Sequence, residues 1–87
     1  MLKVSSSRKF DKSFKKIPAT IKLAFYKRLT LFLSSPDHPQ PHNHPLRGRL
    51  KGRYSFNITG DWRVIYRKIN NNHVYFDSIG THSQLYK

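Results

Sequence analysis

Apolar residues recur at helical spacing in the first third of the chain. Between residues 8 and 17 they stand four and three positions apart among lysines and arginines, which predicts an amphipathic helix with one buried stripe: Phe10, Phe14 and Ile17. A serine among residues 5–7 should cap this helix. Pro18 should end it and open a second helix that runs to about Ser34. The alternating stretch at residues 2–6 predicts a short edge strand before both helices.

The rest of the chain changes to strand periodicity. Residues 34–45 hold four prolines and three histidines and should form an irregular loop. Apolar and polar residues then alternate over 54–58 and 62–67 around a turn at 59–61, and a third strand is expected over 74–79, ended by Gly80. This order predicts one α+β domain over residues 1–87, with an N-terminal strand and a two-helix antiparallel hairpin packed on a small, mainly antiparallel sheet. The other sheet face should be free to bind.

Charge points to the kind of partner. The chain has 17 Lys and Arg, four acidic residues and a formal net charge of +13. Solubility of a small domain needs a net charge of only about 2–8, so the excess predicts a polyanionic partner: nucleic acid, an anionic membrane or an acidic protein. The absence of cysteine excludes a disulfide framework and a thiolate metal site. No apolar run approaches the ~18 residues of a membrane span, and no signal segment begins the chain. We expect a cytoplasmic protein without a metal or cofactor.

Cations and aromatic residues are interleaved in the strand region. Cations neutralise phosphates and aromatic rings stack on unpaired bases, which favours single-stranded nucleic acid as the ligand of five residues: Arg49, Lys51, Arg53, Trp62 and Arg67. Strand aromatics more often belong to a core. Core packing is the favoured interpretation for Tyr66. For Trp62, core packing and stacking on a base are equally good interpretations.

The same region holds the groups for RNA cleavage without a metal. The 2′-hydroxyl must lose a proton, the charge around phosphorus must be stabilised, and the 5′ oxygen must gain a proton. Asp61 or a histidine suits the first step, the planar fork of Arg63 the second, and His82 the third, since imidazole exchanges protons near neutral pH. A lone histidine near a terminus is ordinarily a surface residue, so the inference rests on the co-occurrence of these groups.

The proline-rich loop carries three histidines whose spacing would also suit a metal site: His38, His42 and His44. The loop has one nearby acid and no cysteine. Surface histidines are therefore the better interpretation.

Three segments stand in an order that resembles the RelE/ParE superfamily of bacterial toxins, nearest to the YafQ-type mRNA endonucleases: NHPLRGRLKG, GDWRVIYR and GTHSQLYK. The resemblance implies two helices on a small antiparallel sheet, cleavage of mRNA in the ribosomal A site, and a cognate antitoxin with an acidic toxin-binding segment. It places catalytic roles on five positions: His44, Asp61, Arg63, His82 and Tyr86. Two positions depart from the YafQ-type pattern, because Asn57 replaces a histidine and Ser78 replaces an arginine.

The leading hypothesis is a ribosome-dependent mRNA endonuclease, the toxin of a type II toxin–antitoxin pair. One alternative is a ParE-like toxin that poisons DNA gyrase through protein contacts and needs no acid–base pair. Another is an RNA- or DNA-binding module without catalysis, whose affinity would depend steeply on salt.

Overall fold

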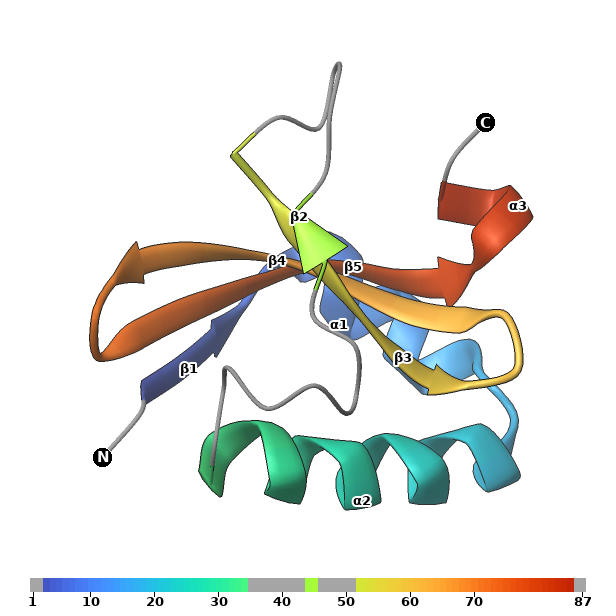
Figure 1. Cartoon of the computed structure of the whole chain (residues 1–87). Coiled ribbons are helices and arrows are strands. Elements are labelled where there is room, and N and C mark those ends of the chain that lie inside the picture. The colour runs from blue at the N-terminus through green and yellow to red at the C-terminus, as the bar shows by residue number, and fades with distance from the viewer. Residues whose placement is uncertain (1–2, 35–43, 46–51, 86–87) are drawn as a thin grey trace.

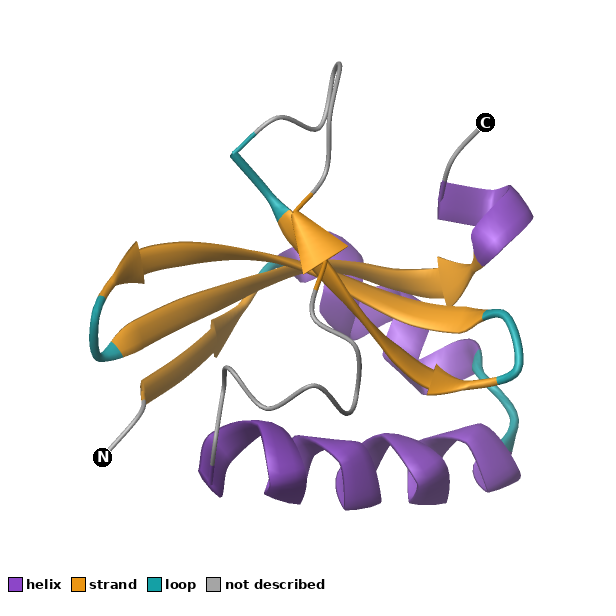
Figure 2. Cartoon of the chain, in the orientation of Figure 1, coloured by secondary structure: helices purple, strands orange, loops and turns teal. Residues whose placement is uncertain are grey.

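The computed structural model describes residues 3–34, 44–45 and 52–85. The elements follow one another as β1 (Lys3–Ser6), α1 (Arg8–Lys16), α2 (Ala19–Ser34), β2 (His44–Pro45), β3 (Tyr54–Thr59), β4 (Trp62–Asn70), β5 (His73–Thr81) and α3 (His82–Leu85) (Figure 2). The predicted α+β order of one strand, two helices and an antiparallel meander is confirmed. The short elements β2 and α3 are additions to it. No helix within these ranges has the length and apolar character needed to cross a membrane.

The strands form one mixed sheet in the order β1-β5-β4-β3-β2. β1 pairs in parallel with β5 and the other neighbours are antiparallel, so the sheet is mainly antiparallel and β1 lies at its edge, as predicted. The predicted end of the third strand is wrong. Gly80 pairs with Arg63 and Thr81 pairs with Trp62, so β5 continues past the glycine. A Cβ at position 80 would lie 2.8 Å from Oε1 of Gln84, so this glycine allows α3 to approach the strand closely.

The ends of the first two helices follow from local chemistry. Ser7 caps α1, because its Oγ accepts a hydrogen bond from the backbone N–H of Phe10 at 2.9 Å. The same hydroxyl donates to the carbonyl oxygen of Asp77 at 2.6 Å and ties the start of α1 to β5. Pro18 has no backbone N–H to donate, and its carbonyl oxygen accepts from Ile21 and Lys22 in the first turn of α2.

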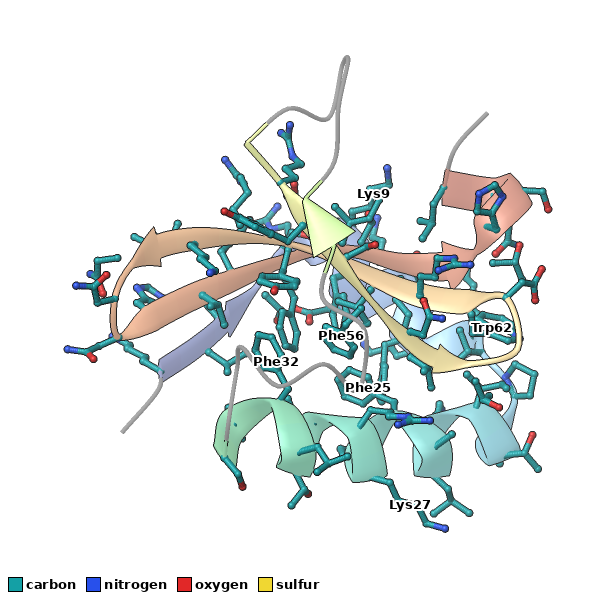
Figure 3. The ribbon with its side chains drawn as sticks, viewed as in Figure 1. Lys9, Phe25, Lys27, Phe32, Phe56 and Trp62 are labelled. Atoms are coloured by element: carbon teal, nitrogen blue, oxygen red, sulfur yellow. The ribbon has the colours of Figure 1, made fainter. Side chains whose placement is uncertain are left out.

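Both helices cover one face of the sheet with aromatic side chains (Figures 1 and 3). From α1, the ring of Phe10 packs 5.5 Å from Phe76 of β5, and from α2 the ring of Phe32 packs 5.0 Å from Phe56 of β3. Tyr66 belongs to this cluster with 1% of its surface exposed, which confirms the core interpretation. Rings of this size bury a large apolar area and supply most of the driving force for the fold.

The opposite sheet face is polar. Strand register sets Asn57 beside Arg63 and Ser55 beside Ile65, and pairs Ile65 in turn with Ser78. Ile65 is 2% exposed yet stands outside the aromatic core cluster, because strand alternation points it away from the helices. The arginines of β4 share this second face, where the candidate chemistry gathers.

Candidate functional site

The β3–β4 turn meets the end of β5 at one corner of the sheet. The backbone N–H of His82 donates to the carbonyl oxygen of Asp61 at 2.8 Å, one register step beyond the Trp62–Thr81 pair. Both side chains are exposed and start from adjacent points of the backbone. The two residues that the sequence predicts as an acid–base pair therefore come together, although they lie far apart along the chain.

A capping box fixes the position of His82. Oε1 of Gln84 accepts from the backbone N–H of Thr81 at 2.9 Å, and the Gln84 N–H donates to Oγ1 of Thr81 at 3.4 Å. This reciprocal pair starts α3 with His82 as its first residue. The spacing Thr-x-x-Gln in Thr81–Gln84 is the sequence signal for this cap, so Gln84 is a positioning residue that the pattern could have revealed.

Arg63 lies next to the corner and is held by Asn57. The two residues pair across β3 and β4, and Nη1 of Arg63 donates to Oδ1 of Asn57. Nε of Arg63 is buried without a hydrogen-bond partner in the described ranges. Asn57 cannot exchange a proton as the expected histidine could. It can instead orient the Arg63 guanidinium, since its amide oxygen accepts a hydrogen bond from the charged donor.

A second polar cluster surrounds Asp77. A bulge in β5 separates the Ile65–Ser78 pair from the Tyr66–Phe76 pair and leaves Asp77 between them. Its carboxylate accepts from Nε of Arg53 at 2.6 Å and from Nη2 of Arg67 at 3.4 Å. Two of the predicted phosphate-binding arginines thus share an internal acidic partner, which the sequence pattern did not single out.

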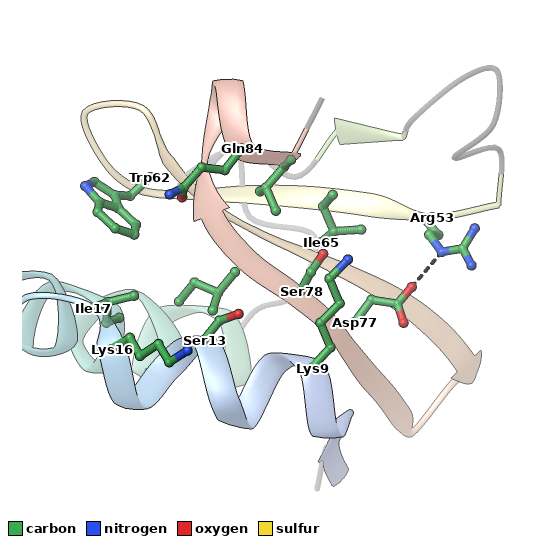
Figure 4. Close-up of a pocket in the computed structure, with 12 residues that line it drawn as sticks. Lys9, Ser13, Lys16, Ile17, Arg53, Trp62, Ile65, Asp77, Ser78 and Gln84 are labelled. Carbon is green, nitrogen blue, oxygen red and sulfur yellow. Dashed lines mark hydrogen bonds and ion pairs between the residues drawn. The ribbon is translucent and has the colours of Figure 1, made fainter. Parts of the chain in front are cut away.

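Trp62 packs against the core, and its proposed stacking on a base stays a prediction. The ring is half-buried and packs against the aromatic core, yet it also lines a pocket along the edge of β5 (Figure 4). Ser78 lines the same pocket and is 8% exposed.

Other predicted site residues are not positioned by the structure. Arg49, Lys51 and Tyr86 lie outside the described residues, as do His38 and His42 of the proline-rich loop. The backbone of His44 belongs to β2 and pairs with Ser55, near the start of β3, whereas Asp61 follows the end of that strand. The backbone register therefore does not place His44 directly beside Asp61.

Comparisons with known proteins agree with this architecture. A family model described as the bacterial toxin of a type II toxin–antitoxin system, YafQ, matches residues 2–87. Among solved structures, YafQ from E. coli strain BL21(DE3) superimposes with a TM-score of 0.72 at 23% identity, covering 100% of both chains. The E. coli DinJ-YafQ complex matches with a TM-score of 0.70 at 25% identity over 100% of both chains. A YoeB/ParE toxin from Agrobacterium tumefaciens gives 0.77 at 16% identity, covering 93% of this chain and 99% of the other.

A search of curated proteins finds no significant match to the chain.

Proposed function

The chain belongs to the YafQ family of bacterial type II toxin–antitoxin toxins, within the RelE/ParE superfamily, and on this premise we propose that it is a ribosome-dependent mRNA endonuclease that inhibits translation. The observation that carries the proposal is the corner where the Asp61 carbonyl oxygen accepts a hydrogen bond from the His82 N–H. Arg63 stands two residues after Asp61 on β4 and pairs with Gly80. An acid, a base and a phosphate-binding cation are the three groups that metal-independent RNA cleavage requires.

In the proposed reaction the nucleophile comes from the RNA itself. The Asp61 carboxylate accepts the proton of the ribose 2′-hydroxyl, and the 2′ oxygen attacks the adjacent phosphorus. The P–O5′ bond breaks, and His82 in its imidazolium form donates a proton to the departing 5′ oxygen. The products are a 2′,3′-cyclic phosphate, which can open to a 3′-phosphate, and a 5′-hydroxyl. No step of this scheme uses a metal or a cofactor.

Arg63 stabilises the negative charge that develops on the phosphorane oxygens. A donor already aimed at that position needs little reorganisation in the transition state. The hydrogen bond to Asn57 supplies this alignment. The resemblance adds His44 as a further proton-transfer group and Tyr86 as a residue that orients the substrate. Arg49, Lys51, Arg53 and Arg67 would hold the flanking phosphates, with Arg53 and Arg67 aligned by Asp77.

The proposed partners are mRNA in the ribosomal A site and a cognate antitoxin. E. coli YafQ has been crystallised in a toxin–antitoxin complex with DinJ. A net charge of +13 on this chain favours an antitoxin with an acidic toxin-binding segment, since opposite charges accelerate association.

The experiment is cleavage of a defined mRNA in a translating extract, with products mapped by primer extension. We expect His82→Ala to lower the cleavage rate about 10²–10⁴-fold and Asp61→Asn to lower it by a similar factor, because each change removes one proton-transfer group. His73→Gln and Asp11→Asn are matched controls, since both residues lie away from the corner and should retain the parent rate. Equal cleavage by the parent, His82→Ala and Asp61→Asn would contradict the assigned roles.

The ParE-like alternative makes a different prediction for the same cells. A toxin that acts on gyrase through protein contacts would leave mRNA intact while DNA breaks accumulate, and its effect would not depend on His82. A non-catalytic RNA-binding module would produce neither cut mRNA nor DNA breaks.

A further inference from the structure

A pocket of about 670 Å³ runs along the edge of β5, beside the proposed cleavage corner. β1 pairs with β5 only as far as Phe76, and in the described part of the chain no strand continues that edge. The pocket lies between α1 on one side and α3 on the other, with β4 and β5 between them (Figure 4). Lys9, Ser13 and Lys16 line its α1 wall, and Gln84 lines its α3 wall.

Within the described part of the chain, two lysines of the α1 wall have no hydrogen-bond or ion-pair partner. Lys9 and Lys16 stand two helical turns apart, about 10 Å along the axis, on the face that also presents Ser13. Neither makes an ion pair or a hydrogen bond with any described residue, whereas Arg53 at the end of the pocket is held by Asp77. The charges of Lys9 and Lys16 are therefore available to a ligand.

Most of the remaining lining is apolar and includes one aromatic ring: Ile17, Ile65, Ile79, Leu85 and the half-buried Trp62. Ser78 and Asp77 also line the pocket, and the Asp77 carboxylate is paired with Arg53. Sites for single-stranded nucleic acid combine two components. One is a row of cations along the phosphate backbone of the ligand, and the other is an aromatic ring on which a base can stack. An acidic peptide would use the same charges but would gain less from the indole face.

The pocket lies next to the proposed cleavage corner, although neither Asp61 nor His82 lines it. Gln84 lines the pocket and also belongs to the cap that places His82 at the start of α3. An RNA strand held in the pocket would leave it beside the Asp61–His82 pair. The sequence pattern predicts phosphate-binding cations in the strand region, and the fold places Lys9 and Lys16 of α1 in the same pocket as Arg53.

We propose that this pocket is a subsite for the single-stranded RNA next to the scissile bond, with Lys9 and Lys16 binding consecutive phosphates and Trp62 stacking on a base. The inference rests on the proposed function and names where its substrate is held. It gives α1 a direct role in binding RNA, in addition to its role in covering the sheet.

The test is binding of a fluorescent RNA oligonucleotide with 2′-O-methyl riboses, which cannot be cleaved, measured by anisotropy at several salt concentrations. The double variant Lys9→Ala/Lys16→Ala should bind more weakly, and the slope of log affinity against log salt should decrease by about 1.4, since each single-strand phosphate contact contributes about 0.7. The matched control Lys15→Ala/Lys27→Ala removes the same charge from exposed positions outside the pocket, and its slope should change by less than about 0.5. Figure 3 shows Lys9 and Lys27 on opposite sides of the molecule.

Equal slopes for the two double variants would overturn the proposal, because net charge alone would then explain the binding. A loss of oligo-glutamate binding in Lys9→Ala/Lys16→Ala with unchanged RNA binding would also overturn it and would assign the pocket to an acidic peptide. The variant Trp62→Leu adds an independent readout, since it should weaken RNA binding without changing the salt slope. Because the probe cannot be cleaved, its binding does not depend on the proposed nuclease activity, so a failure of the subsite is separable from a failure of the proposed nuclease.

Discussion

The two faces of the sheet differ in what their side chains contact. The face under the helices is a cluster of stacked and edge-to-face rings, in which Phe32 and Phe56 are fully buried. The opposite face carries arginines held by single acceptors, namely Arg63 by Asn57 and both Arg53 and Arg67 by Asp77. The first face determines stability. On the second face, hydrogen bonds and ion pairs orient cations, contribute little to stability and would suit the proposed anionic ligand.

This difference predicts that substitutions separate into two groups. Changes to the aromatic face should unfold the protein, and changes to the polar face should impair activity at nearly constant stability. Such a separation holds only if the polar contacts contribute little to folding, as expected for partly exposed ion pairs.

The largest expected effect is on the aromatic face. Phe32→Ala should lower the free energy of unfolding by about 3–5 kcal/mol, because the ring contacts Phe56, Tyr66 and Phe76 and its loss leaves a cavity. Urea denaturation followed by circular dichroism measures the change. Leu23→Ala, at a side chain that is 65% exposed on the same helix, is the control and should change stability by less than about 0.5 kcal/mol. Similar losses for both variants would contradict the assignment of the core.

The next effect is on the polar face. Arg63→Ala should reduce mRNA cleavage about 10²–10³-fold, because it removes the donor proposed to stabilise the phosphorane charge. Its urea midpoint should stay close to that of the parent. Asn57→Ala keeps the arginine but removes its acceptor, so it should show a smaller loss of the same kind. A large drop in stability with unchanged specific activity would place Arg63 among the structural residues.

A smaller effect is expected from the cap of α3. Gln84→Ala should destabilise the helix start by about 1 kcal/mol, since the Thr81 N–H loses its acceptor. Because His82 is the first residue of that helix, cleavage should fall while binding of uncleavable RNA falls less. Gly80→Ala should reproduce the effect, because its Cβ would displace the end of the Gln84 side chain. Unchanged cleavage in both variants would show that the cap does not position His82.

A small effect on stability is also expected at Asp77. Asp77→Asn removes the charge that Arg53 and Arg67 share, and these pairs are exposed enough that screening limits the loss to about 1 kcal/mol or less. The same change should strengthen RNA binding that lacks sequence preference, because it frees two cations, and should lower the cleavage rate per bound RNA. Filter binding and cleavage assays on one preparation measure both quantities. If RNA binding and cleavage rise or fall together, Asp77 only offsets the positive charge of Arg53 and Arg67 and does not orient them.

Local patterns predicted most of the fold. Spacings of three and four located α1 and α2, alternation located β3, β4 and most of β5, and Pro18 located the boundary between the helices. Each of these signals depends on one face of one element being buried. The end of β5 differs from the prediction because Gly80 does not end the strand but permits close packing by Gln84.

Features that depend on long-range register were not predictable from local patterns. Asp77 meets Arg53 and Arg67 only because a bulge shifts β5 against β4, and nothing in the sequence around Asp77 marks that shift. The partnership of Asn57 with Arg63 likewise depends on the pairing of β3 with β4. The Asp61–His82 pair was predicted from residue chemistry and resemblance, and the backbone contact that joins the two residues came from the structure.

The chemistry proposed for the Asp61–His82 corner has one direct test. An mRNA with a single 2′-deoxynucleotide at the mapped cut position is translated in the extract beside its all-ribose counterpart, and the product ends are analysed. We expect the all-ribose mRNA to yield a 2′,3′-cyclic or 3′-phosphate and a 5′-hydroxyl, and the 2′-deoxy substitution to abolish cleavage at that position. Cleavage of both mRNAs at the same rate, or products with a 5′-phosphate, would contradict the proposed chemistry.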